Sequence, residues 1–182
     1  MRPTARGWTP HPRIAAVHES LKALRAVRRY RTDPVPRALI EQIVDAARWT
    51  GSARNGQPWR FIAVTDPDVR AALSRCGAYA VHLAAAPVVL VLASVENAFS
   101  DTAFDMGRVT QSVCLAAQEL DLGTCPTTFH PDHNVAQAAT LVDLPAEWRP
   151  RHAVSIGYPA ATPTPSAIPT GRLPTAELLR WS

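Results

Sequence analysis

A polar, amide-rich loop at residues 51–59 is the segment of this chain best equipped to recognise a ligand. Ser52, Asn55 and Gln57 lie close together in it, and Pro58 and Trp59 end the stretch. Carboxamide side chains carry hydrogen-bond donors and acceptors together, so they match a planar ligand edge that alternates the two. The loop therefore predicts recognition of a planar ligand, and the alternative is a simple turn before a strand.

A basic element lies upstream, where four arginines fall between Arg25 and Arg31. Arg25 and Arg28 are three positions apart, a spacing that predicts a shared helix face. Two or three such charges suffice to bind a phosphate. The alternative is a solvated helix end. The other arginines are scattered and the net charge is only +4, so no nucleic-acid partner is expected.

The cysteines and histidines do not form a metal or nucleophile pattern. The three cysteines are odd in number and lack metal-like spacing, which predicts reduced thiols in a cytoplasmic protein. His130 and His133 have no further ligands nearby in the sequence, and Cys125 has no evident histidine partner. We therefore expect no metal site and no catalytic side chain of these types.

Length and hydrophobic periodicity predict one compact domain at residues 13–182, preceded by an irregular arm at 1–12. The longest apolar stretch, residues 83–93, is too short to span a bilayer, so no membrane association is expected. Within the domain, residues 159–182 form a proline-rich, extended arm. Gly123 is expected to cap the longest helix in a left-handed conformation. The predicted helices are 13–25, 35–47, one starting at Asp66, 102–122, 134–141 and a turn at 177–181. The predicted strands are 61–64, 87–93 (buried on both faces) and 151–158, and residues 124–129 are expected to form a short extended or loop segment.

The order of these features resembles the nitroreductase family of FMN-dependent oxidoreductases, over about Leu21 to Trp181. The most specific match is the loop Ser52-x-x-Asn55-x-Gln57-Pro58-Trp59. Weaker matches are the basic element with its following Asp33-Pro34-Val35-Pro36, the long helix from Asp105, and the pieces Leu122-Gly-Thr-Cys-Pro126 and Ile156-Gly-Tyr-Pro159. Arg172 resembles the arginine that returns to the flavin phosphate.

The resemblance implies an α+β fold: a three-layer α/β/α sandwich with a central mixed, mostly antiparallel sheet, flanking helices and a C-terminal arm reaching the partner subunit. It implies a homodimer with FMN at the interface. The flavin N5 would carry the chemistry, with the backbone of Thr127 and Thr128 near it, and no side chain would be catalytic. The implied cofactor-binding residues are Arg25, Ala26, Arg28, Ser52, Asn55, Gln57, Pro126, Thr127, Thr128 and Arg172.

The implied reaction is a ping-pong transfer of hydride from NADH or NADPH, through the flavin, to a nitroaromatic, quinone or similar small acceptor. Two alternatives stay open: a flavin-dependent dehydrogenase of a natural product, and a non-enzymatic member that binds flavin weakly. The second arises because Leu24, Ala26 and Thr170 replace an arginine, a serine and a lysine common in the family. Each lost charge-assisted contact removes roughly 1.5–3 kcal/mol of binding.

Overall fold

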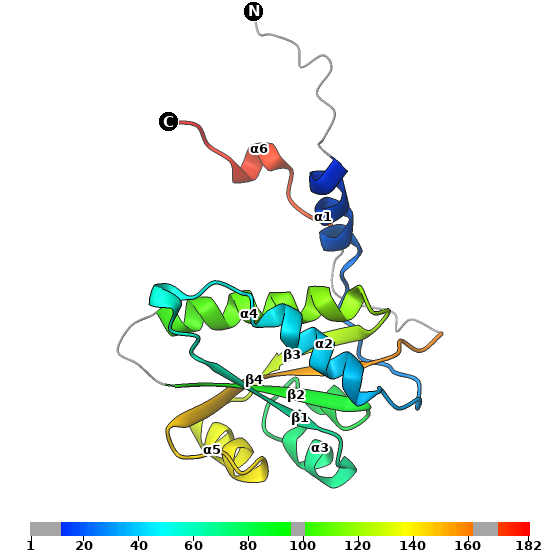
Figure 1. The fold of residues 1–182 in the computed structure, drawn as a ribbon, viewed down its shortest axis with the longest axis vertical. Helices are drawn as coiled ribbons and strands as arrows, with labels where there is room; N and C mark the ends of the chain where they lie inside the picture. The colour runs from blue at the N-terminus through cyan, green and yellow to red at the C-terminus, as the bar shows by residue number, and fades with distance from the viewer. Residues whose placement is uncertain (1–11, 96–100, 162–170) are drawn as a thin grey trace, which may run out of the picture.

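The computed structural model describes residues 12–95, 101–161 and 171–182 (Figure 1). Residues 1–11 of the predicted N-terminal arm and residues 162–170 of the predicted C-terminal arm lie outside the described residues. The helices are α1 Pro12–Ala23, α2 Arg37–Ala47, α3 Pro67–Leu73, α4 Asp101–Gln118, α5 Asp132–Leu141 and α6 Thr175–Leu178, with short 3-10 turns η1 Ala53–Asn55 and η2 Val81–Leu83; the strands are β1 Trp59–Val64, β2 Val88–Val95, β3 Gly123–Thr128 and β4 Trp148–Gly157.

An antiparallel sheet in the order β1-β2-β4-β3 forms the middle layer. Helices α2 and α4 cover one face, and α3 and α5 cover the other (Figure 1). Beyond β3, a bridge between Ala26 and Thr124 is parallel, which gives the sheet its mixed character. The predicted three-layer α+β sandwich is therefore confirmed.

The central strand β2 supplies both halves of the core. Val88, Leu90 and Leu92 pack with α2 and α4, whereas Val89 and Val91 pack on the opposite face of the sheet. All five side chains are buried, and each contributes about 1.5–3 kcal/mol through removal from water. The expectation that this apolar run is buried on both faces is confirmed.

The end of α4 differs from the sequence prediction. The helix ends at Gln118 instead of residue 122, and Asp121 is the left-handed residue, with φ 58°. Gly123 instead begins β3, where an added Cβ would lie 2.7 Å from the Cβ of Val27. The left-handed cap predicted at Gly123 is wrong, because close packing of another segment explains this glycine.

Both ends of the described chain stand apart from the sandwich. Helices α1 and α6 project from the side covered by α4 (Figure 1). Helix α1 is joined to the end of α4 where Gln118 Nε2 donates to the Ser20 carbonyl at 2.9 Å. Helix α6 begins two residues before the predicted turn at 177–181. In the described part of the chain, no helix combines the length and apolar character needed to cross a membrane.

Candidate functional site

The amide-rich loop adopts an unusual backbone between α2 and β1. Arg54, Asn55 and Gln57 have positive φ values of 52°, 53° and 45°, a left-handed conformation that is uncommon outside glycine. Such residues cost about 1–3 kcal/mol each and persist only where the surrounding structure holds them. The carboxamides of Asn55 and Gln57 are exposed and lie 3.4 Å apart, from Nε2 to Oδ1. The loop thus presents donors and acceptors to solvent.

A residue of helix α4 anchors this loop. The buried carboxylate of Asp105 accepts the Ala53 N–H at 2.8 Å, and its other oxygen lies 3.3 Å from Arg108 Nη1. Within the loop, Ser52 Oγ accepts the Gln57 N–H at 2.9 Å. The local sequence around Asp105 does not reveal that this residue clamps the loop, because its partner Ala53 is 52 residues away.

The basic segment is extended, so the predicted helix face shared by Arg25 and Arg28 is wrong. Helix α1 ends at Ala23, and the Val27 N–H then donates to the Thr124 carbonyl at 2.8 Å. Pairing with the edge of β3 replaces the helical hydrogen bonds that the arginine spacing suggested. Residues 24–31 therefore lie along β3 and the end of β4.

The two arginines of this segment have different surroundings. Arg25 is exposed and donates to the carbonyls of Lys22 and Leu24, at the end of α1. Arg28 is also exposed and lies within hydrogen-bonding reach of the Cys125 thiol. Burial raises the pKa of Cys125, and the Arg28 charge opposes that shift. Arg28 thus lies beside the first part of the Cys125–Thr128 segment. Ala26 is exposed between the two arginines.

The register of β3 distinguishes the two threonines expected near flavin N5. The N–H of Phe129 donates to the Arg151 carbonyl at 2.8 Å, and β3 pairs with β4 without a register shift. In antiparallel strands, hydrogen-bonded pairs alternate with pairs that are not bonded. The N–H of Thr127 therefore points into the β3–β4 ladder, whereas that of Thr128 points away from β4.

Two further residues agree with this alternation. Thr124 has the same parity as Thr128, and its carbonyl accepts the Val27 N–H from the side of β3 away from β4. Pro126 has this parity too, and it has no N–H to lose from the ladder. Thr127 is buried, whereas Thr128 is exposed. Of the two threonines, only Thr128 therefore has its backbone N–H on the edge of β3 that faces away from β4.

The remaining predicted residue, Arg172, lies in the projecting arm. Every residue from 171 to 182 is exposed, and Arg172 Nη1 donates to the neighbouring Gly171 carbonyl at 2.6 Å. The described contacts of Arg172 do not bring it to the loop or to the basic segment of its own chain.

The described residues show no arrangement suited to metal chemistry. No group of three or more His, Cys, Asp or Glu side chains among them is placed to hold a metal ion. The three cysteines are buried and free.

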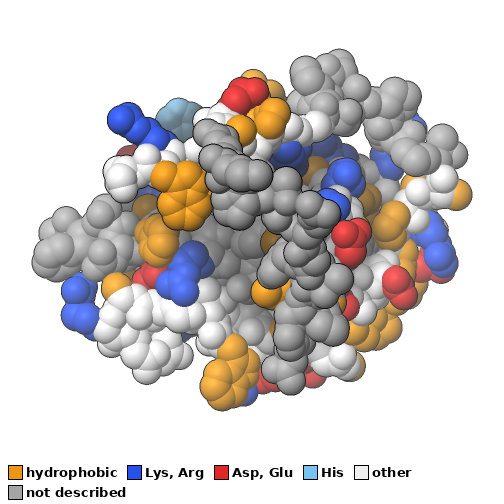
Figure 2. Space-filling model, turned by 90° about the horizontal axis from the view of Figure 1, so that it is seen from above, with side chains coloured by type: hydrophobic (Ala, Val, Ile, Leu, Met, Phe, Trp, Pro, Cys, Tyr) orange, Lys and Arg blue, Asp and Glu red, His pale blue; other side chains and the backbone are white. Residues whose placement is uncertain are grey.

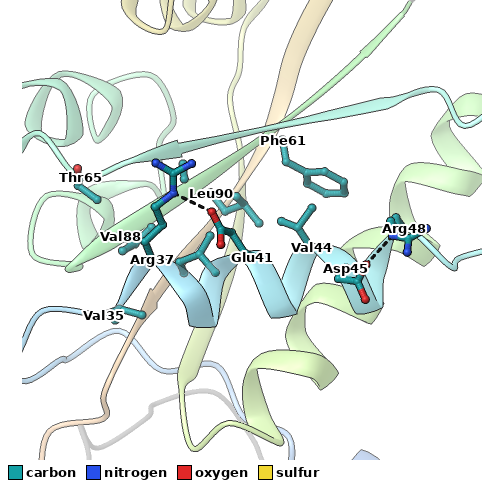
Figure 3. A pocket seen from close by; sticks show the side chains of 12 residues that line it. Val35, Arg37, Glu41, Val44, Asp45, Arg48, Phe61, Thr65, Val88 and Leu90 are labelled. Atoms are coloured by element: carbon teal, nitrogen blue, oxygen red, sulfur yellow. Dashed lines mark hydrogen bonds and ion pairs between the residues drawn. The ribbon is translucent and has the colours of Figure 1, made fainter.

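A groove of about 720 Å³ lies on the other edge of the sheet, between α2 and β1. Its floor is apolar, and Val44 and Phe61 face it from opposite sides (Figure 3). Two ion pairs, Arg37–Glu41 and Arg48–Asp45, lie along α2 at its rim. The groove runs beside β1, a strand paired on one side only in the described sheet.

Comparison with known proteins then places the fold. The model of the nitroreductase family matches residues 21–80 and 74–158. The chain belongs to the nitroreductase family.

The relatives and solved structures agree with this assignment. A candidate NADH dehydrogenase/NAD(P)H nitroreductase of Methanothermobacter thermautotrophicus is 30% identical over 81% of this chain and 79% of its own. The FMN reductase [NAD(P)H] of Bacillus subtilis is 27% identical over 79% of this chain and 66% of its own. The crystal structure of a candidate nitroreductase from Desulfovibrio desulfuricans, in complex with FMN, is 27% identical and superposes with a TM-score of 0.76 over 94% of this chain and 96% of that one.

The groups present in this nitroreductase-family chain suit a flavin mononucleotide chemically. Guanidinium groups fit a phosphate, and exposed carboxamides fit the alternating edge of the flavin ring. The outward N–H of Thr128 is a fixed donor of the kind that stabilises developing negative charge. The donor set therefore fits FMN, with fewer basic side chains than are common in the family.

Proposed function

We propose that this protein is an FMN-dependent oxidoreductase that passes electrons from NADH or NADPH to a nitroaromatic, quinone or similar acceptor. The observation that carries the proposal is that the backbone N–H of Thr128 points away from β4, on the same strand edge that pairs with the basic segment. FMN, when bound, would supply hydride acceptance and donation in ping-pong order. The protein itself would bind the cofactor, orient its ring and polarise it.

The residues divide this work between them. Arg25, Arg28 and Arg172 would neutralise the phosphate and neighbouring polar groups, because guanidinium ions bind such oxygens with strong, oriented hydrogen bonds. Asn55 and Gln57 would frame the ring edge. The Thr128 N–H would donate to N5 and stabilise negative charge there. No side chain is assigned a proton-transfer step.

We also propose that the functional unit is a homodimer with residues of both chains in each site. The loop is held by Asp105, near the start of α4, whereas the basic segment pairs with Thr124, beyond its end. These lie at opposite ends of α4 in Figure 1, about 20 Å apart at the rise of an α-helix. A two-fold partner would supply its loop to the first chain's basic segment.

Exposed apolar side chains support this assembly. They lie among charged side chains on the face from which α1 and α6 project (Figure 2). In α1 they are Ile14, Val17 and Leu21, and in the arm they are Leu173, Leu178, Leu179 and Trp181. Large apolar side chains left exposed in such number favour an interaction surface. The groove beside β1 offers the partner's arm an apolar floor and a free strand edge.

Measurement of mass in solution tests the dimer. We expect twice the chain mass for the wild type, and a shift toward monomer when residues 171–182 are removed, since the deletion takes away apolar contact area. A matched control deletes only Ser182, which leaves the apolar residues in place. A monomeric wild type that retains tight FMN binding would refute the two-chain site.

Thermal melting with added FMN tests the cofactor. At FMN concentrations a hundredfold above Kd, binding contributes about 2.7 kcal/mol, which raises Tm by about 5–10 °C for a chain of this size. AMP, which has a phosphate but no flavin ring, is the control and should leave Tm unchanged. An unmoved Tm at saturating FMN identifies the chain as a member that does not bind flavin.

Steady-state assays then separate the two enzymatic readings. The reconstituted protein should consume NADH or NADPH in the presence of a quinone or nitroaromatic. Parallel initial-rate lines at varied donor and acceptor would support ping-pong order. Tight FMN binding without nicotinamide consumption would instead favour a flavin-dependent dehydrogenase of another substrate.

A further inference from the structure

A buried polar cluster joins the basic segment to the sheet. The Tyr30 hydroxyl contacts the Val27 carbonyl and lies 2.6 Å from Ser155 Oγ. Ser155, which is completely buried on β4, donates through Oγ to the Cys125 carbonyl at 3.2 Å. Three separate pieces of chain, the basic segment, β4 and β3, therefore meet at the Tyr30–Ser155 pair.

The ring of Tyr30 packs against the protein independently of its hydroxyl. The ring lies against Gly157, where an added Cβ would be 2.8 Å from Tyr30 Cδ1, so phenylalanine would fill the same space. Burial raises the pKa of Tyr30, which keeps the hydroxyl protonated and able to donate. Because Ser155 gives its proton to the Cys125 carbonyl, the single proton of the Tyr30 hydroxyl is shared between the Val27 carbonyl and Ser155 Oγ, and it ties these two groups together.

The hydrogen bonds of Tyr30 and Ser155 lie on both sides of Arg28. The Tyr30 hydroxyl reaches back to Val27, so it closes the short stretch of chain that contains Arg28. The Arg28 side chain lies by the Cys125 thiol, next to the carbonyl that Ser155 holds. His82 is also buried, and its Nε2 lies 3.3 Å from the Cys125 carbonyl oxygen. A carbonyl only accepts, so Nε2 carries the proton; burial and the Arg28 charge both lower the pKa of His82, consistent with a neutral ring.

We propose that Tyr30 and Ser155 are positioning residues that hold Arg28 against β3 and thereby set the affinity of the site for FMN. The inference rests on the proposed function and adds to it a pair of residues that need not touch the cofactor. Loss of the Tyr30 hydroxyl frees the Val27–Tyr30 stretch, and Arg28 then spends less time in its binding orientation.

The test compares FMN dissociation constants, measured by flavin fluorescence, in a double-mutant cycle. Tyr30→Phe is expected to weaken FMN binding about tenfold, equal to about 1.4 kcal/mol, and Ser155→Ala to act in the same direction. In an Arg28→Ala background, Tyr30→Phe should have no further effect, because the residue through which it acts is gone. A Tyr30→Phe effect that persists undiminished in that background, or no effect in the wild type, overturns the proposal.

A second readout needs no cofactor. Tyr30→Phe should speed amide hydrogen exchange at Val27 and Arg31, whose N–H groups are bonded to Thr124 and Tyr158. Tyr158→Phe is the matched control, since it removes a hydroxyl that has no hydrogen bond among the described residues. Unchanged exchange in Tyr30→Phe overturns the positioning role, whereas a wild type that fails to bind FMN overturns the proposed function and leaves this measurement to decide the cluster.

Discussion

Thr128→Pro is expected to lower the rate of NAD(P)H-dependent reduction by about 10²–10³-fold, the usual effect of removing one preorganised backbone donor from a developing charge. The substitution deletes the one N–H that points away from β4 at this position of β3. It spares the strand ladder, because the N–H of Thr128 is not part of it. Proline is tolerated in edge strands where the missing N–H faces outward, and Pro126 already occupies a position of the same parity.

Two variants control for side-chain and folding effects. Thr128→Ala keeps the backbone N–H and removes only the hydroxyl, so its rate should stay close to wild type. Thr127→Pro removes an N–H inside the β3–β4 ladder and should lower Tm. The measurements are steady-state kinetics of the FMN-loaded protein and thermal melting. A Thr128→Pro variant with wild-type rates would show that this N–H has no part in the chemistry.

The position of the amide-rich loop between α2 and β1 could be predicted from the sequence because the information that specifies it is local. Ser52, Asn55 and Gln57 lie in one short polar stretch, and the exposure of the two carboxamides follows from the composition of that stretch. The central strand could be predicted equally well, since residues 87–93 form an unbroken apolar run that can be buried only where both faces of the sheet are covered. Patterns of this kind depend on neighbouring residues in the chain.

The basic segment could not be predicted in the same way. The spacing of Arg25 and Arg28 suits a helix, but the Val27 N–H finds a partner in Thr124, 97 positions along the chain. That pairing packs Val27 against Gly123, a glycine that the local sequence predicts to be a helix cap. Long-range pairing determines both the extended basic segment and the role of Gly123, and no local sequence pattern indicates that pairing.

Long-range pairing also decides whether Thr127 or Thr128 has its backbone N–H directed away from β4. Both residues are threonines in an extended stretch, so their types and neighbours do not separate them. The register with β4 separates them, through the bond from Phe129 to Arg151. The clamp formed by Asp105 was likewise hidden, because an aspartate in a helix gives no sign of the loop amide that it will accept.

Asp105→Ala is expected to weaken FMN binding by about ten- to a hundredfold, which is roughly 1.4–2.8 kcal/mol. The carboxylate holds the Ala53 N–H, and the left-handed residues Arg54, Asn55 and Gln57 follow directly. A backbone in that conformation stays there only while its surroundings hold it. Without the carboxylate, the loop relaxes toward ordinary conformations, and binding must then reorder it at a cost in free energy.

The loss of stability should be smaller than the loss of affinity. Arg108 is 44% exposed in its side chain and can turn to solvent once Asp105 is gone, and the freed Ala53 N–H is only half-buried. We therefore expect the free energy of unfolding to fall by about 1 kcal/mol. Denaturant unfolding of the cofactor-free protein and FMN titration measure the two quantities separately.

Asp105→Asn and Asp68→Ala complete the comparison. The asparagine keeps one oxygen to accept the Ala53 N–H, so its FMN affinity should lie between those of the wild type and the alanine variant. Asp68 is an exposed aspartate at the start of α3, on the opposite face of the sheet, and its removal should leave FMN affinity unchanged. If Asp105→Ala binds FMN as tightly as Asp68→Ala does, the loop keeps its shape without the clamp, and the strain in its left-handed residues must be supported from elsewhere.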